Sequence, residues 1–216
     1  MSELNQYIKA HRNDFSGELM EEKNLPTEPH QLFELWLQQA IDKNCIEPYA
    51  MVLTTVKDNF MPSSRVVYLR GWEGGKLIFY TNYMSEKVQD IFSHPNVSLN
   101  FHWADVHRQV RIVGPAIKAN KSTSDDYFES RPRESKIGAW ASPQSQKIQG
   151  RSELQKRFEE IEKKFEGIEV PRPEHWGGIE ITPNFFEFWV GRPSRLHDRI
   201  VYQRGDSVWE RFRLAP

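Results

Sequence analysis

The chain has 216 residues, a formal net charge of −1 at pH 7, 38% hydrophobic residues and 27% charged residues. These values are typical of a globular protein with a substantial core, and they argue against a disordered chain. The near-neutral charge also argues against a general nucleic-acid binder, because such a protein needs a surplus of Lys and Arg to contact phosphates. Cys45 is the only cysteine, so the sequence excludes an internal disulfide and a cysteine-based metal cluster.

The N-terminal segment differs from the rest of the chain. Residues 1–28 carry mixed charge with little periodicity, which predicts a mobile N-terminal arm. No linker or repeat divides residues 29–216, which are expected to form one domain. The first residues lack the apolar core of a signal peptide, and no apolar run is long enough to span a bilayer. A cytoplasmic protein that binds no membrane is the simplest interpretation.

Apolar spacing in the first half predicts two helices and several strands. Residues Pro29–Asn44 form an amphipathic pattern whose apolar face is Phe33, Trp36, Leu37, Ala40 and Ile41. Strands are expected, in chain order, at 49–56, 63–72, 76–82, 97–103 and 108–119. Gly74 and Gly75 are typical of a hairpin turn between the second and third of these strands. A short helix is expected over residues 85–94, with the buried stripe Val88, Ile91 and Phe92.

The second half predicts two more helices and three more strands. Ser122 is a candidate N-cap for a helix near residues 122–131. A longer helix is expected over 152–167, with the apolar stripe Leu154, Phe158, Ile161 and Phe165. Strands are expected at 184–191, 195–204 and 208–214. Many short strands with a few peripheral helices predict a mainly β fold, a β-barrel with helical additions.

A basic segment near the C-terminus suggests a binding site. If residues 195–204 are extended, Arg195, His197 and Arg199 share one face, because strand side chains alternate with period two. Such a row could bind an anion or carry a proton. The alternative is a solvated edge strand, on which charges prevent pairing with other chains.

Several common catalytic motifs are missing from the sequence. It contains no P-loop, no G-x-G-x-x-G after a strand, no H-E-x-x-H and no G-x-S-x-G. His102 and His107 are five residues apart and share no face of a helix or strand, so we expect no metal site. Cys45 lies in a helical pattern and is interpreted as a core residue.

Cations lie beside hydroxyl groups or amides in four places. The four groups are Arg65 with Arg70; Tyr80, Thr81, Ser85 and Lys87; Tyr127, Arg131, Arg133 and Ser135; and the basic segment 187–204. The second group surrounds a predicted helix N-terminus, where backbone amides favour phosphate. Each group alone is compatible with an ordinary surface. Two phosphates, one on a cofactor and one on a substrate, would explain all four.

Five motifs, which follow one another along the chain in the family's order, resemble the pyridoxine (pyridoxamine) 5′-phosphate oxidase family. They are FYTN, RQVRIVG, SRPRESKIGAW, RLHDR ahead of YQR, and the terminal RLAP. The resemblance runs from about Leu32 to Pro216 and implies a homodimeric, FMN-binding split β-barrel. It further implies a reaction of vitamin B6 salvage. Pyridoxine or pyridoxamine 5′-phosphate is oxidised to pyridoxal 5′-phosphate, with hydride passing to the flavin and oxygen reduced to hydrogen peroxide.

The resemblance also implies particular site residues. FMN ligands are expected at Arg65, Val66, Val67, Tyr68, Leu69, Arg70, Tyr80, Thr81, Lys87, Gln109, Gln144, Ser145, Trp189 and Arg199. Substrate ligands are expected at Arg12, Arg70, Tyr127, Arg131, Ser135, Arg195 and His197. Arg195 and His197 are also the expected catalytic pair, which hold the pyridine ring near the flavin. His197 could take up a proton from the substrate or only orient it, and both roles stay open.

The sequence departs from the family pattern at three positions. Arg70 stands where the family usually has Lys, which keeps the charge. Phe15 stands where Tyr is common, in an arm expected to act with Arg12 as a substrate lid. Glu86 stands where an Arg usually lies beside the flavin phosphate. Its carboxylate would repel that phosphate unless it turned away or paired with Lys87 or Arg65. We therefore expect weaker FMN retention, improved by Glu86→Arg.

Two other functions are compatible with the same features. The first is a split-barrel flavin enzyme acting on another ring substrate, as phenazine-pathway relatives do. The set Tyr127, Arg131 and Ser135 favours a phosphorylated substrate instead. The second is a module that binds FMN or pyridoxal phosphate without turnover. Such a module would not need Arg195 and His197, so their presence favours catalysis.

Overall fold

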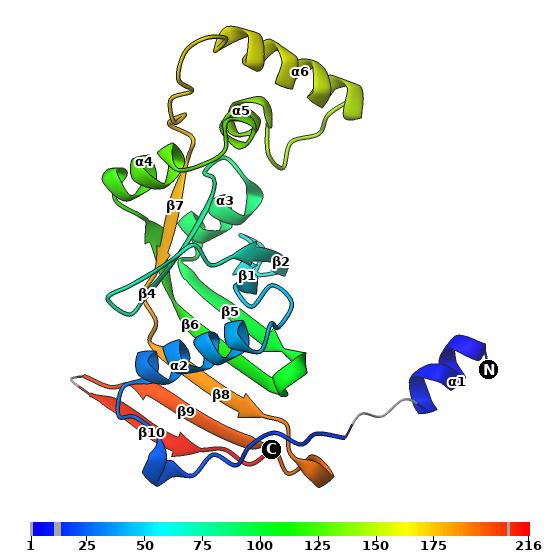
Figure 1. The fold of residues 1–216 in the computed structure, drawn as a ribbon, viewed down its shortest axis with the longest axis vertical. Helices are drawn as coiled ribbons and strands as arrows, with labels where there is room; N and C mark the ends of the chain where they lie inside the picture. The colour runs from blue at the N-terminus through cyan, green and yellow to red at the C-terminus, as the bar shows by residue number, and fades with distance from the viewer. Residues whose placement is uncertain (1, 11–13, 207) are drawn as a thin grey trace. The chain divides into compact units, whose positions relative to one another are not determined.

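A computed structural model describes residues 2–10, 14–206 and 208–216, which form mainly β-strands joined by helices (Figure 1). The strands are β1 (Ala50–Val56), β2 (Pro62–Tyr68), β3 (Gly71–Glu73), β4 (Lys76–Asn82), β5 (Asn96–Trp103), β6 (Arg108–Lys118), β7 (Trp176–Ile181), β8 (Phe185–Val190), β9 (Asp198–Arg204) and β10 (Trp209–Arg213). The α-helices are α1 (Glu3–Ala10), α2 (Pro29–Asp42), α3 (Glu86–Ser93), α4 (Lys121–Glu129), α5 (Arg133–Ala141) and α6 (Arg151–Lys164). Short 3₁₀ turns lie at η1 (Glu22–Asn24), η2 (Ala104–Val106) and η3 (Pro193–Arg195).

The chain divides into two compact units. Unit 1 contains Met1–Pro48, Asn100–Ile112 and Phe185–Pro216, and unit 2 contains Tyr49–Leu99 and Val113–Asn184. The proposed organisation, an arm over residues 1–28 and one domain over 29–216, stays a prediction. Among the described helices, none combines the length and apolar character that a membrane crossing requires.

In unit 1, the strands are ordered β10-β9-β8-β6-β5, and α2 supplies apolar side chains to the core. The predicted amphipathic helix is confirmed, because Phe33, Trp36 and Ala40 are all buried. The Phe33 ring lies 5.2 Å from the Phe101 ring, and the Trp36 ring lies 5.2 Å from the Phe188 ring. The prediction was wrong for Ile41, which is exposed.

Part of the segment before α2 contacts β9 and β10. The Met20 amide donates to Asp198 Oδ2 at 3.2 Å, and the Tyr202 hydroxyl donates to the Pro26 carbonyl at 2.7 Å. Arg213 Nε donates to Glu22 Oε1 at 2.5 Å. This hydrogen bond holds the pKa of the Glu22 carboxyl at about 2. Residues 20–26 are therefore fixed to the C-terminal strands by side-chain and backbone hydrogen bonds.

In unit 2, β3 and β4 form the predicted hairpin, with Glu73 paired to Lys76. Gly74 and Gly75 have φ angles of 58° and 76°, which suit glycine in a two-residue turn. β4 also pairs antiparallel with β7, a strand that the sequence analysis did not identify. Two glycines weaken the strand signal there, and a Cβ on Gly177 would lie 2.1 Å from the Tyr83 hydroxyl oxygen.

The helices of unit 2 correct three local predictions. α4 begins at Lys121, so Ser122 lies inside its first turn and is not the N-cap. In α3, Phe92 is exposed, and the buried residues include Asp90 instead. The helix α5, which directly follows Pro132, was not predicted from the sequence. A proline directly before the first turn of a helix is nevertheless well tolerated, since no helical hydrogen bond needs its missing N–H.

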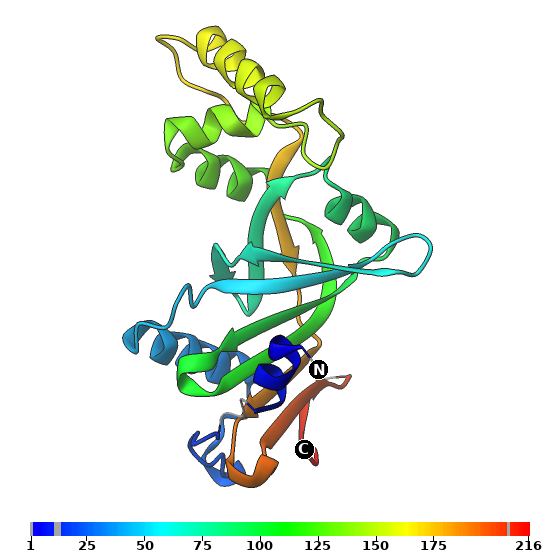
Figure 2. The ribbon, with the colours of Figure 1, turned by 90° about the vertical axis from the view of Figure 1, so that its right-hand side faces the viewer.

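The helices α5 and α6 lie side by side (Figures 1 and 2). Phe158 and Ile161 of α6 pack against a cluster that contains Ile137, Phe165 and Val170. The predicted apolar stripe of α6 is thus confirmed at these positions. Its opposite face carries i,i+4 ion pairs such as Arg157 with Glu153, as expected for a solvated surface.

Candidate functional site

A cavity of about 680 Å³ lies in unit 2. It is lined by Val66, Val67, Tyr68, Arg70, Tyr80, Thr81, Asn82, Lys87, Tyr127, Arg131, Pro132, Ser135, Gly138, Ala139, Ser142, Gln144 and Trp176. Predicted ligands from three separate sequence groups therefore share one cavity. The exceptions in unit 2 are Arg65, Leu69 and Ser145, which are not among its lining residues.

Three aromatic rings are stacked along part of this cavity. The Tyr80 and Tyr127 rings are parallel, with centroids 3.7 Å apart, and the Trp176 ring lies 5.6 Å from that of Tyr80. The Tyr80 hydroxyl donates to the Thr123 carbonyl at 3.3 Å. Burial, with a smaller contribution from Tyr127, raises the pKa of Tyr80 to about 12. Tyr80 is therefore a neutral packing residue at physiological pH.

Arg131 places a cation against this stack, and no described carboxylate forms an ion pair with it. Its guanidinium carbon lies 4.3 Å from the centre of the Trp176 ring. Nη1 of Arg131 is buried and has no hydrogen-bond partner among the described residues. Burial lowers the pKa of this guanidinium. A buried donor without an acceptor is costly, so this nitrogen is suited to an anionic oxygen entering the cavity.

A second cation, Lys87, donates its hydrogen bonds to neutral oxygens in the part of the chain that the structure describes. Its ammonium donates to Thr81 Oγ1 at 3.1 Å, to Ser85 Oγ at 3.1 Å and to Gln144 Oε1 at 3.0 Å. Burial, followed by the nearby charge of Arg65, lowers the pKa of Lys87 to about 8. An anion would supply the counter-charge that Lys87 lacks.

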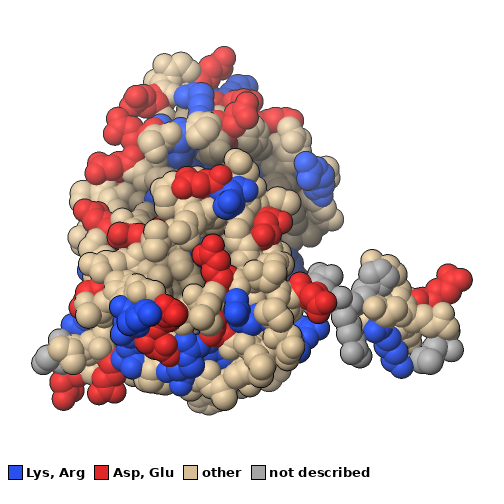
Figure 3. All heavy atoms as spheres, turned by 60° about the horizontal axis from the view of Figure 1, so that its bottom comes forward, with Lys and Arg blue, Asp and Glu red and all other residues tan. Residues whose placement is uncertain are grey.

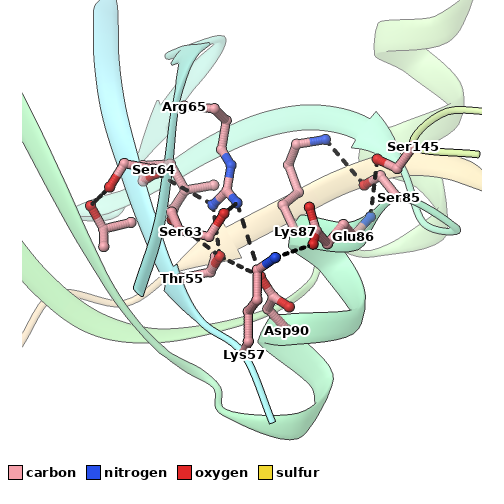
Figure 4. A network of polar contacts seen from close by, with 12 residues as sticks. Thr55, Lys57, Ser63, Ser64, Arg65, Ser85, Glu86, Lys87, Asp90 and Ser145 are labelled. Carbon is pink, nitrogen blue, oxygen red and sulfur yellow. Dashed lines mark hydrogen bonds and ion pairs between the residues drawn. The ribbon is translucent and has the colours of Figure 1, made fainter. Parts of the chain in front are cut away.

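Arg65, by contrast, is bound to neighbouring protein groups (Figure 4). It donates from Nη1 to Thr55 Oγ1 at 2.7 Å and from Nη2 to Ser63 Oγ at 2.8 Å. The buried carboxylate of Asp90 lies 3.9 Å from Nη2 and accepts a 2.6 Å hydrogen bond from Thr55 Oγ1. Arg65 thus has a carboxylate partner, unlike Lys87.

Glu86 has a partner that the sequence analysis did not consider. Its carboxylate accepts a hydrogen bond from the ammonium of Lys57, in an ion pair directed toward the turn after β1 (Figure 4). The pairing with Lys87 or Arg65 that we considered is therefore not the one observed. The Glu86 backbone amide donates to Ser145 Oγ at 3.2 Å. Ser145 thus binds the first turn of α3 and does not line the cavity.

In unit 1, the basic segment is not extended over its whole length. Pro193–Arg195 form a 3₁₀ turn, Ser194 and Arg195 have φ angles of 58° and 62°, and β9 begins only at Asp198. The predicted row of Arg195, His197 and Arg199 on one strand is therefore wrong. The physical reason is the register of β8 with β9, in which Val190 pairs with Asp198, so the residues between them form the connecting loop.

This loop folds around Phe15. The Phe15 ring lies 5.3 Å from the His197 ring and 5.5 Å from the Trp189 ring, in edge-to-face contacts. The guanidinium carbon of Arg195 lies 5.3 Å from the centre of the same ring. The structure therefore brings Arg195, His197 and Trp189 together around one aromatic residue of the N-terminal segment. The predicted ligand Arg12 lies outside the described residues.

The imidazole of His197 has a defined hydrogen bond. Its Nδ1 accepts the backbone N–H of Arg192 at 3.1 Å. Burial, followed by the charge of Arg195, lowers the pKa of His197. Because Nδ1 accepts a hydrogen bond, the neutral ring carries its proton on Nε2. This tautomer has a donor at Nε2 and no free basic nitrogen.

Arg199 occupies a different part of unit 1. It pairs with Trp189 across β8 and β9, and its Nε donates to Glu187 Oε1 at 2.7 Å. Glu187 is 3% exposed and also accepts from Arg111 Nη1 at 2.7 Å. Gln109 shares the face of Arg111 by strand alternation. The sequence analysis missed Glu187, although a single carboxylate within the apolar run FFEFWV is itself unusual.

Positive and negative side chains are mixed on one face of the molecule. On the face drawn in Figure 3, the coloured Lys and Arg side chains are interspersed with Asp and Glu. A nucleic-acid surface would carry a continuous basic stripe. The described residues on this face do not form one.

Two family models and several known proteins match the chain. Residues 37–165 match a model described as pyridoxamine 5′-phosphate oxidase, and residues 176–216 match the C-terminal dimerisation region of pyridoxine 5′-phosphate oxidase. A pyridoxine/pyridoxamine 5′-phosphate oxidase from Cytophaga hutchinsonii is 47% identical over 207 residues. The match covers 95% of this chain and 96% of the relative.

Solved structures show the same fold. PhzG from Burkholderia lata, determined with tetrahydrophenazine-1-carboxylic acid, is 28% identical with a TM-score of 0.87, covering 93% of this chain and all of its own. An FMN-binding protein from Nostoc punctiforme related to pyridoxamine 5′-phosphate oxidase has a TM-score of 0.70 at 15% identity, covering 88% of this chain and 98% of its own. The predicted fold class, a mainly β split barrel with peripheral helices, is confirmed.

Proposed function

The chain belongs to the pyridoxine/pyridoxamine 5′-phosphate oxidase family, and on that premise we propose that it oxidises pyridoxine or pyridoxamine 5′-phosphate to pyridoxal 5′-phosphate, with FMN as cofactor. The observation that carries this proposal is the unpartnered, buried Nη1 of Arg131 in the unit 2 cavity. A phosphate dianion can satisfy such a nitrogen through charge-assisted hydrogen bonds.

Arg131 acts with Tyr127, Ser135 and Arg70 in this proposal. All four line the cavity, and together they offer two cations and two hydroxyl groups to one phosphate. Binding through that remote phosphate fixes the position of the reacting carbon. The substrate thereby loses its translational and rotational freedom on binding, so that less entropy is lost in reaching the transition state.

FMN fits a third cation of the cavity, Lys87. We propose that Lys87, Thr81 and Gln144 hold its phosphate, and that Val66, Val67 and Tyr68 of β2 border its ring system. The support is chemical, since the ammonium of Lys87 donates to three neutral oxygens and, among the described residues, no carboxylate lies within ion-pair distance of it. When bound, FMN supplies the two-electron acceptor for the substrate and passes the electrons to oxygen, giving hydrogen peroxide.

Arg195 and His197 are proposed to position the substrate ring, and Trp189, Arg199 and Gln109 to contact the cofactor. The Nδ1 hydrogen bond of His197 favours the orienting role over the basic role. Nε2 then donates a hydrogen bond to the substrate and does not remove its proton.

We also propose that the enzyme is a homodimer. The support is the match of residues 176–216 to a dimerisation region. A cytoplasmic location stays a prediction.

A second candidate is oxidation of an unphosphorylated ring substrate, which the similarity to PhzG favours. The two functions differ in their need for a substrate phosphate. We therefore propose anaerobic absorption spectra of the FMN-loaded protein, with pyridoxine 5′-phosphate and with unphosphorylated pyridoxine.

The phosphate oxidase predicts that only the phosphorylated compound bleaches the flavin band. Air should then restore the band as pyridoxal 5′-phosphate and peroxide form. A flavin that stays oxidised with pyridoxine 5′-phosphate, and also with pyridoxamine 5′-phosphate in a further sample, would contradict the proposal and favour another substrate or a binding-only role.

A further inference from the structure

The ion pair of Lys57 with Glu86 lies beside the proposed cofactor site and takes no part in the function described above. Lys57 follows β1 directly, and Glu86 is the first residue of α3. Both side chains are partly exposed, at 38% for Lys57 and 53% for Glu86. The pair joins the β1–β2 turn to the helix that carries Lys87 (Figure 4).

Both ends of this pair are fixed by backbone hydrogen bonds. The Lys57 amide donates to the Met61 carbonyl at 3.0 Å, and the Phe60 amide donates to the Lys57 carbonyl at 2.8 Å. At the other end, the Glu86 amide donates to Ser145 Oγ. The ion pair therefore connects two backbone segments that other contacts already hold in place, which lowers the entropic cost of forming it.

The electrostatic environment explains why the pair matters. The hydrogen bond to Lys57 lowers the pKa of Glu86, with smaller contributions from Arg65 and Lys87, so the carboxylate is charged at neutral pH. Arg65 has its own carboxylate nearby in Asp90. Among the described residues, Lys87 has no carboxylate within ion-pair distance, although the charge of Glu86 acts on it from further away and raises its pKa. Without Lys57, the unpaired Glu86 carboxylate would be free to pair with Lys87 and would repel any phosphate bound there.

We propose that Lys57 is a positioning residue for the phosphate of FMN, acting through Glu86. It keeps the Glu86 carboxylate paired and directed toward the β1–β2 turn, so that this negative charge neither pairs with Lys87 nor repels the phosphate of the cofactor. This inference rests on the proposed FMN site. It also lowers the gain expected from Glu86→Arg, because the carboxylate is already compensated.

The test is a set of FMN dissociation constants for the flavin-free, full-length protein, measured by quenching of flavin fluorescence. The variants are Lys57→Met, Lys57→Arg, Glu86→Gln and the double variant Lys57→Met/Glu86→Gln. Lys76→Met is the matched control, because Lys76 pairs with Glu180 at 2.8 Å with a comparable exposure of 45%. Thermal unfolding of each variant establishes that it is folded.

We expect Lys57→Met to weaken FMN binding about fivefold at low ionic strength, with a smaller loss in high salt. Glu86→Gln, Lys57→Arg and Lys76→Met should bind like the wild type. The double variant should match Glu86→Gln, because removing the carboxylate removes the need for Lys57.

Three results would overturn the inference, each in a different way. An unchanged constant for Lys57→Met would show that Lys57 has no influence on the site. A double variant as weak as Lys57→Met would show that Lys57 acts on the phosphate directly. A wild type that binds no FMN would contradict the proposed cofactor, and the inference with it.

Discussion

Several arginines of unit 1 differ from two cations of the unit 2 cavity in what neutralises them. In unit 1, Arg199 and Arg111 share the buried carboxylate of Glu187, and Arg213 pairs with Asp198 and Glu22. In the unit 2 cavity, Lys87 contacts neutral oxygens, and Arg131 has a buried nitrogen without an acceptor.

This difference separates cations that carboxylates already compensate from cations of the cavity that are left for a ligand to compensate. Arg199, proposed above to contact the cofactor, would do so as part of its pair with Glu187. A buried cation with a carboxylate partner is already compensated, and it gains little from binding an anion. Burying a cation without such a partner raises the free energy of the folded protein, and a bound anion lowers it again. The charged group that pairs with an Arg therefore indicates the function of that Arg better than its occurrence in a basic motif does.

The largest effect is expected from removing a cavity cation that has no described carboxylate partner. Arg131→Met should raise the KM for pyridoxine 5′-phosphate about a hundredfold, because charge-assisted hydrogen bonds to the substrate phosphate are lost. Steady-state kinetics measure this change. Arg157→Met on α6 is the control, since Arg157 already pairs with Glu153, and its KM should stay at the wild-type value. An equal KM for both variants would contradict the role of Arg131.

The contribution of the carboxylate-paired arginines to stability is tested at Glu187. Glu187→Gln should lower the free energy of unfolding by about 2 kcal/mol, because Arg111 and Arg199 lose a shared buried counter-charge. Urea denaturation at a fixed protein concentration gives this value. Glu180→Gln, which removes a carboxylate paired with the partly exposed Lys76, should have a smaller effect. A change no larger than that of the control would show that the Glu187 cluster adds little to stability.

The smallest effect concerns the dependence of FMN binding on pH. Burial lowers the pKa of Lys87 from 10.5 to about 8, and a bound phosphate favours its charged form. FMN binding should therefore take up a proton near pH 8, and the dissociation constant should rise about fivefold from pH 7 to pH 9. Calorimetry in buffers of different ionisation enthalpy measures the proton uptake. Lys87→Arg, which stays charged, should bind with little dependence on pH in this range.

In the flavin-free protein, the same pKa shift has the opposite consequence for stability. The unfolded chain, with Lys87 near 10.5, binds more protons than the folded chain between about pH 8 and pH 10.5. The contribution of Lys87 to the free energy of unfolding therefore rises with pH across this window. A fall in the wild type, relative to Lys87→Arg, would contradict the assignment of the low pKa to Lys87.

Local sequence signals predicted the elements that depend on local physics. The Gly74–Gly75 turn was predictable because few residues other than glycine adopt its positive φ angles. The helix α2 was predictable because Phe33, Trp36 and Ala40 recur at helical spacing. Cavity residues such as Lys87 and Arg131 were identified as cations beside hydroxyl groups. The family resemblance then assigned them as ligands, and many of the residues so assigned do line one cavity.

Features that depend on distant partners were not predictable in this way. The strand β7 is defined by its pairing with β4, and its two glycines conceal it in the sequence. The partner of Glu86 is 29 residues away, and no local pattern identifies Lys57 among the other lysines. The turn at Pro193–Arg195 follows from the register of β8 with β9, so a simple alternation argument placed Arg195 incorrectly.

The pairing of β4 with β7 has a consequence for synthesis of the protein. Lys76 and Glu180, which form an ion pair across these strands, are separated by 104 residues. Trp176, which stacks on Tyr80 and supports Arg131, begins the later strand. A ribosome must therefore translate most of the chain before the cavity can close, and a nascent chain that ends before β7 lacks the ring against which Arg131 packs.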